Sequence, residues 1–197
     1  SEKYVLDGDG PRVALLDLGA KDNIAKSLNK RGCEVTVYPA HTTAEEIISA
    51  DPDGIMLSNG PGDPADCTSI IEEIRKLYNT DIPIFAICLG HQLMALATGA
   101  STHKLKYGHR GGNHPVKDME TGRVYISSQN HGYVVDETAL PDGAVITETN
   151  LNDGTVAALA YGGRPAFSVQ YEPESVVGGR DKGAVYRRFL ELIEAGR

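Results

Sequence analysis

The first half of the chain alternates short apolar runs with amphipathic segments, and this regular order leaves few folds open to it. The apolar runs predict buried strands at 12–18, 34–38, 54–57 and 82–87. The segments between them predict helices after the capping residue Asp22, at 43–50 and at 70–78. This order implies parallel β-α-β units in one sheet covered on both faces, an α/β fold whose ligands bind at the carboxyl ends of the strands.

The second half of the chain has a different texture. Beyond Gly99, shorter β-branched segments separated by Gly, Asn and Asp predict strands that make this half partly antiparallel. These strands are expected at 124–128, 144–149 and 166–170, before a final helix at 185–193. No internal repeat or linker occurs, so we expect one domain at 11–197, preceded by a tail or remnant of a missing domain at 1–10.

Charge and cysteine usage exclude several classes of partner and site. Lys and Arg total 19 against 27 for Asp and Glu, so nucleic acid and anionic membranes are poor partners. The apolar run at 82–89 is too short to span a membrane and the polar start is no signal peptide, so we expect a cytoplasmic protein. Cys33, Cys67 and Cys88 lack paired spacing, so neither a disulfide framework nor a metal site is expected.

The sharpest local motif is I-P-I-F-A-I-C-L-G-H-Q at 82–92. It places Cys88 where a buried strand meets a helix, with the small residues Ala86 and Gly90 on either side, which is the layout of a nucleophile elbow. The helix N-terminus would favour a thiolate there. The alternative is that Cys88 is a small buried hydrophobic residue at a strand end.

A second motif, N-G-P-G-D-P at 59–64, follows the strand at 54–57. In one interpretation, its glycines bring backbone N–H groups against an anionic oxygen. The alternative is that this segment is an ordinary tight turn. A cysteine nucleophile also needs a base nearby. Four histidines lie among Gly and Asn, and the sequence leaves open which of them serves: His91, His109, His114 and His131.

These motifs carry a resemblance to a known family. A-I-C-L-G-H-Q together with S-N-G-P-G-D-P resembles class I glutamine amidotransferase domains. Three further stretches are similar to the small-subunit family of carbamoyl phosphate synthetases, at 106–118, 127–133 and 150–155. The resemblance covers nearly the whole chain, from Leu18 onward.

The resemblance implies a reaction and its partners. The cysteine would attack the side-chain amide of L-glutamine, release ammonia and leave a glutamyl thioester for water. The ammonia would feed a large ATP-dependent synthetase subunit, in a heterodimer or higher assembly that also includes an N-terminal small-subunit domain missing from this sequence. No G-x-x-x-x-G-K-[ST] motif occurs, so no cofactor is expected in this chain, and ATP and magnesium are expected on the partner subunit.

The resemblance also implies site residues, position by position. Cys88 would be the nucleophile, and the glutamine would be held and polarised by Lys21, Gly60, Gly62, Leu89, Gln92, Asn130, Gly132 and Tyr133. Tyr133 stands where the family commonly has Phe, which is a modest change if the backbone makes the contact.

One departure affects the catalytic residues themselves. The family carries its remaining triad members in a Gln-Tyr-His-Pro-Glu stretch, whereas this chain has Glu172 at the histidine position, followed by Glu174. A carboxylate beside Cys88 disfavours the thiolate, so we expect a raised cysteine pKa and strongly impaired hydrolysis. Two arrangements would restore some hydrolysis. His131 or His91 would act as the base, or a protonated Glu172 would donate a proton to the leaving group.

Two rival functions remain at this stage. One is a non-catalytic glutamine-binding or scaffold module that regulates the synthetase subunit. The other is a cysteine hydrolase for a different γ-glutamyl substrate, which gives no reason for the N-H-P-V and Q-N-H-G segments.

Overall fold

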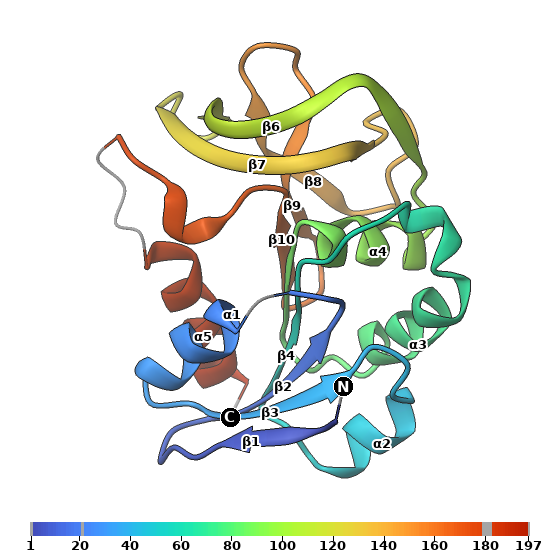
Figure 1. Ribbon diagram of the computed structural model, residues 1–197, viewed down its shortest axis with the longest axis vertical. Coiled ribbons are helices and arrows are strands. Elements are labelled where there is room, and N and C mark those ends of the chain that lie inside the picture. The colour runs from blue at the N-terminus through green and yellow to red at the C-terminus, as the bar shows by residue number, and fades with distance from the viewer. Residues whose placement is uncertain (1, 21, 179–182, 197) are drawn as a thin grey trace.

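The computed structural model describes residues 2–20, 22–178 and 183–196, which form one ten-stranded sheet with helices on both faces (Figure 1). The strands are β1 (Tyr4–Leu6), β2 (Arg12–Asp17), β3 (Glu34–Pro39), β4 (Gly54–Leu57), β5 (Ile84–Ile87), β6 (Thr102–Asp118), β7 (Val124–Val135), β8 (Ala144–Asn150), β9 (Val156–Tyr161) and β10 (Ala166–Val169). The helices are α1 (Asn23–Lys30), α2 (Ala44–Ser49), α3 (Thr68–Tyr78), α4 (Leu89–Ala97) and α5 (Ala184–Ala195), with short 3-10 turns at Pro64–Asp66 and Pro173–Ser175.

The sheet divides into a parallel and an antiparallel half. Its strand order is β1-β3-β2-β4-β5-β10-β9-β8-β6-β7. The run from β3 to β10 is parallel, and every pair from β10 through β9, β8 and β6 to β7 is antiparallel. The predicted α/β class with a partly antiparallel second half is therefore confirmed.

Two apolar layers cover the faces of the parallel half. Successive residues of β2 point to opposite faces, so Leu16 lies in one cluster with α2, α3 and α4, and Leu15 in the other with α1 and α5. Figure 1 shows the same division, with α1 and α5 on one side of the strands and α3 and α4 on the other. A strand buried on both faces needs a continuous apolar run, which is the pattern the sequence shows.

The predicted elements agree with the structure closely in the parallel half, with one correction and one additional strand. Thr43 caps α2 by accepting from the Glu46 N–H at 3.2 Å, but Asp22 occupies the N-cap of α1 without a side-chain cap hydrogen bond. Within the segment expected to be a tail, β1 pairs antiparallel with the edge strand β3. The strands β6 and β9 were not predicted as such.

Candidate active site

The turn at Cys88 has the geometry of an elbow. Cys88 lies between β5 and α4 with φ 51° and ψ −105°, a backbone conformation that residues other than glycine rarely adopt and that clusters at functional sites. Its N–H donates to the Val169 carbonyl at 2.8 Å, which ties the turn to β10. Gly90 is required two residues later, because an added Cβ would lie 2.6 Å from the Leu57 carbonyl oxygen.

A cavity of about 910 Å³ opens at this turn, at the carboxyl ends of the parallel strands. The structure brings together most of the predicted site, since the lining includes Gly60, Gly62, Cys88, Leu89, Gln92, Asn130, Gly132, Tyr133 and Glu172. Glu174 is not among the lining residues, and Lys21 lies outside the described residues. The predicted adjacency of the two motif loops is also confirmed, because β4 and β5 are neighbouring parallel strands.

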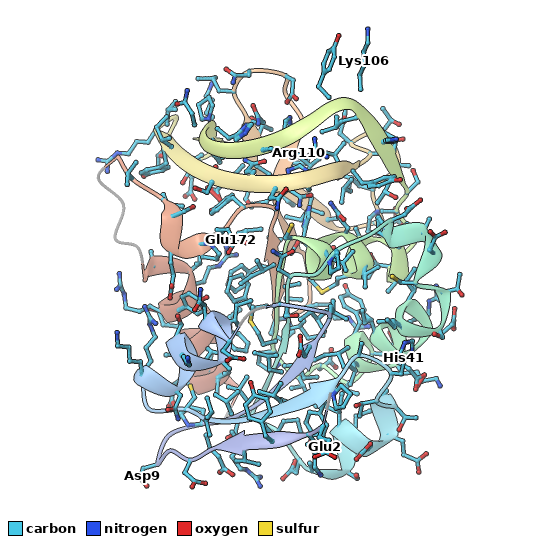
Figure 2. The ribbon with its side chains drawn as sticks, viewed as in Figure 1. Glu2, Asp9, His41, Lys106, Arg110 and Glu172 are labelled. Carbon is cyan, nitrogen blue, oxygen red and sulfur yellow. The ribbon has the colours of Figure 1, made fainter. Side chains whose placement is uncertain are left out.

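The cavity wall also contains charged residues that sequence reasoning did not single out. Lys104 and Arg110 line it from β6, and Asp63 lines it from the loop after β4. In Figure 2, Arg110 lies at the β6–β7 ribbons and Glu172 on the segment that follows β10. Arg110 lies within the stretch 106–118 and Lys104 lies just before it, but only the spatial arrangement shows that both cations line the cavity.

The thiol of Cys88 is held in its neutral form. Cys88 is 5% exposed, and burial together with the charge of Glu172 raises its pKa to about 12. The Gln170 side chain donates to Sγ at 3.4 Å and the Leu89 N–H donates to the same atom, and both lower the pKa. Desolvation and like charge therefore outweigh the hydrogen bonds and helix dipole that favour a thiolate.

Glu172 takes part in the site through Asn59. Its Oε1 accepts from Asn59 Nδ2 at 3.0 Å. Desolvation raises the pKa of Glu172, the Asn59 hydrogen bond lowers it, and the charge of Glu174 raises it again. Glu174 itself accepts a hydrogen bond from the hydroxyl of Ser27 on α1. The two carboxyl groups thus contact different partners.

The glycine loop differs from the expected oxyanion site in one respect. The Gly60 N–H donates to its neighbour Asn59 Oδ1 at 2.7 Å, so this donor is engaged within the loop. Gly60 is nevertheless required for close approach, because an added Cβ would lie 2.0 Å from the Leu18 carbonyl oxygen. Asn59 bridges the loop and Glu172, an arrangement that sequence reasoning missed because the two residues are 113 positions apart.

Two buried amides link the elbow to β7. Gln92 Nε2 on α4 donates to the Tyr133 carbonyl at 2.8 Å and to Gln170 Oε1 at 3.0 Å. Gln170 in turn donates to Cys88 Sγ. The strand β7, the helix α4 and the cysteine therefore belong to one hydrogen-bonded unit.

The histidines proposed as rescuing bases are already committed to other contacts. His91 Nδ1 lies 2.6 Å from Ser168 Oγ, its Nε2 is buried without a partner, and burial lowers its pKa to about 3. His131 lines the cavity, but Nδ1 lies 2.8 Å from the Tyr133 carbonyl oxygen, and burial lowers its pKa to about 4. Neither ring is hydrogen-bonded to the cysteine.

Metal clusters and membrane-spanning helices are both missing from the described residues. No group of three or more His, Cys, Asp or Glu side chains in the described ranges is arranged to hold a metal ion. None of the helices seen in this part of the chain has the length and apolar character to cross a membrane.

Comparison with protein families gives a match across this fold. The model of the glutamine amidotransferase class-I family matches residues 14–192. The crystal structure of a putative GMP synthase component from Thermoplasma acidophilum is similar, with a TM-score of 0.82, 21% identity and coverage of 95% of this chain and 96% of that one. At this identity the likeness concerns the fold alone, and it confirms the expected sheet architecture.

Curated sequences give a narrower match. The chain is 52% identical over 192 residues to a carbamoyl phosphate synthase small chain of Symbiobacterium thermophilum, covering 97% of this chain and 53% of the relative. It is 49% identical over 197 residues to a pyrimidine-specific small chain of Halalkalibacterium halodurans, covering all of this chain and 54% of the relative. The chain therefore spans about half the length of the curated relatives it matches.

Proposed function

Because the chain belongs to the class I glutamine amidotransferase family, we propose that it is the glutaminase portion of a carbamoyl phosphate synthase small chain, with its hydrolysis strongly impaired by Glu172. The observation that carries the proposal is the elbow: Cys88, in a strained backbone conformation, faces a cavity lined by the residues predicted to hold glutamine. A large synthetase subunit that uses the released ammonia is the proposed partner.

The proposed chemistry follows from the contacts of Cys88. The thiol proton must leave before the sulfur attacks the amide carbon, and the departing amine must gain a proton before ammonia is released. A histidine at position 172 could accept the first proton and supply the second. Glu172 instead raises the pKa of the thiol, so deprotonation is the step that its charge opposes.

Protonated Glu172 can supply only half of this cycle. Its raised pKa increases the fraction that carries a proton, which it could donate to the leaving amine. A protonated Glu172 would still not stabilise the thiolate, because a neutral carboxyl provides no positive partner. We therefore expect residual rather than efficient hydrolysis.

The test is glutamate production from glutamine by the parent chain and by Glu172→His, with and without a large synthetase subunit. We expect the histidine to raise turnover about a thousandfold or more, the usual scale for a triad member. Glu172→Gln is the matched control, because it removes the charge without adding a base, and Cys88→Ala should abolish the gain. No hydrolysis by any form, even with the partner, would contradict the proposal.

The second candidate is a glutamine-binding module without catalysis. The observation that favours it is the position of both candidate histidine bases, neither of which is hydrogen-bonded to the cysteine. It predicts that the parent chain binds glutamine but that Glu172→His remains inactive. Calorimetric binding measured beside the activity assay separates the two functions.

A further inference from the structure

A run of hydrogen bonds begins at the cysteine and passes through the substrate-facing strand. From Cys88 Sγ it proceeds through the side chain of Gln170 to that of Gln92, and from there to the carbonyl of Tyr133. All three side chains are buried, with exposed fractions of at most 5%. This inner part of the run involves only residues of the site already described.

The run continues outward through two histidines to an aspartate. His131 Nδ1 lies 2.8 Å from the Tyr133 carbonyl oxygen, and His131 Nε2 lies 3.3 Å from His109 Nδ1. His109 Nε2 lies 2.6 Å from Asp153 Oδ2. Each downstream motif contributes one member, since 106–118 contains His109, 127–133 contains His131 and 150–155 contains Asp153. The proposed reaction has so far given His109 and Asp153 no role.

The pairing of β6 with β7 explains how the two rings meet. His109 and His131 are directly opposite in the ladder, so their side chains lie on the same face of the sheet. Register irregularities occur on both sides of this pair, between Lys104 and His109 and between Gly111 and His114. The ring planes are perpendicular, with centroids 4.9 Å apart. Bulges of this kind redirect side chains locally, and they often do so beside active sites.

The hydrogen-bond partners of the two rings fix how each ring is held. The Tyr133 carbonyl can only accept, so it fixes a proton on His131 Nδ1, and the Asp153 carboxylate fixes one on His109 Nε2. The nearest partner of His131 Nε2 is Gln129 Oε1 at 2.8 Å, and His109 Nδ1 lies further away at 3.3 Å. Asp153 holds the His109 ring through Nε2, and the His109 ring in turn packs perpendicular to the His131 ring.

We propose that His109 and Asp153 are a positioning pair for the glutamine site, holding His131 and through it the Tyr133 backbone in place for substrate. The inference rests on the proposed function, because the strand it positions is the one proposed to bind glutamine. His109 is not among the residues that line the cavity, so the pair acts through His131 rather than by touching the substrate.

Asp153 also has a local structural role that the test must separate from positioning. Its Oδ1 accepts from the Thr155 N–H at 3.0 Å and from the Thr155 hydroxyl at 2.7 Å, which closes the turn between β8 and β9. A purely structural Asp153 would affect thermal stability through this turn and would not depend on His109. A positioning Asp153 would affect glutamine affinity only while His109 is present.

The experiment is a double-mutant cycle on glutamine affinity, measured by titration calorimetry of the 197-residue chain. We expect His109→Ala and Asp153→Ala each to weaken binding about tenfold, and the double variant to bind no more weakly than either alone. Asp153→Asn should keep most of the affinity, because its amide oxygen can still accept from His109 and Thr155. Asp142→Ala, an exposed aspartate in the loop before β8, is the matched control.

A second measurement separates positioning from stability. In the Glu172→His background, we expect the two alanine substitutions to raise KM about tenfold and to leave kcat unchanged, with unfolding recorded for each variant. If an alanine variant fails to fold, His109→Gln and Asp153→Asn provide the same comparison. Additive losses of affinity, or lowered stability with unchanged affinity, would overturn the inference. Glutamate production by Glu172→His would still support the proposed function in that case. A parent chain that does not bind glutamine removes both.

Discussion

The parallel and antiparallel halves of the sheet are built by different means. All residues of β4 and β5 are buried, and the helices cover both faces with apolar side chains. In β6, by contrast, only two of the 17 residues are fully buried, and side-chain hydrogen bonds such as that between His109 and Asp153 join it to its surroundings. Apolar burial thus shapes the first half and continues into β9, whereas β6 depends on specific polar contacts.

The candidate site lies where the two halves meet. β5 pairs with β10 in parallel, and β10 pairs with β9 in antiparallel fashion, so the seam brings Cys88 beside the segment that holds Gln170 and Glu172. The parallel half supplies the strained turn, and the antiparallel half supplies the groups that set the protonation of the thiol. Each half should therefore respond in its own way to substitution and to pH.

The largest effect is expected at the seam itself, in the reactivity of Cys88. A thiol with a pKa of about 12 instead of 9.0 has roughly a thousandfold less thiolate at pH 8, so we expect iodoacetamide to label it very slowly. The labelling rate should rise tenfold per pH unit and continue to rise beyond pH 10. Peptide mass spectrometry after timed alkylation measures this rate.

The control for this prediction is Glu172→Gln, which removes one cause of the shift and leaves burial, the larger cause, in place. It should speed labelling at pH 8 without restoring the rate of an exposed cysteine. Because the folded state holds the thiol proton more tightly, the same shift stabilises the fold below about pH 9 and loses that stabilisation as the pH rises toward 12. A labelling rate that levels off near pH 8 would show that the thiol is not held neutral.

The second effect is a loss of stability at acid pH that should differ between the two halves of the sheet. Burial lowers the pKa of His131 from 6.5 to about 4, so between these values the unfolded chain binds a proton that the folded chain does not. This ring alone should therefore lower the free energy of unfolding by up to about 3 kcal/mol as the pH drops through this window, and the buried His91 adds a loss of the same sign. We expect β6 and β7 to lose protection first and β2 and β4 last.

Hydrogen exchange followed by mass spectrometry at pH 7 and pH 5, corrected for intrinsic rates, checks this order. His131→Asn is the control, because it removes this ring and should reduce the pH dependence of stability to the part that comes from the buried His91, whose pKa is also lowered. Equal loss of protection in both halves would mean that polar contacts are not what distinguishes the antiparallel half.

The difference between apolar burial and polar contacts also explains which elements the sequence could predict. Apolar runs and helical spacing place β4 at the predicted bounds and α5 within two residues, because elements buried by apolar contact carry their own periodicity. β6 has no such signal, since it is mostly polar and rich in glycine. The elbow was predictable because it is local in sequence. Asn59 with Glu172 and His109 with Asp153 were not, because nothing in a single sequence links residues 113 and 44 positions apart.

The smallest effect contrasts one glycine from each half. An added Cβ at Gly90 would lie 2.6 Å from the Leu57 carbonyl oxygen, a backbone atom of the parallel half. At Gly132 the nearest atom is the end of the long Arg110 side chain, 3.5 Å away. We expect Gly90→Ala to destabilise the fold by about 1–3 kcal/mol, despite the better helix propensity of alanine, and Gly132→Ala to change stability by less than about 0.5 kcal/mol. Urea unfolding of both variants measures the difference. Equal costs would show that the antiparallel half is as closely packed around its backbone as the parallel half.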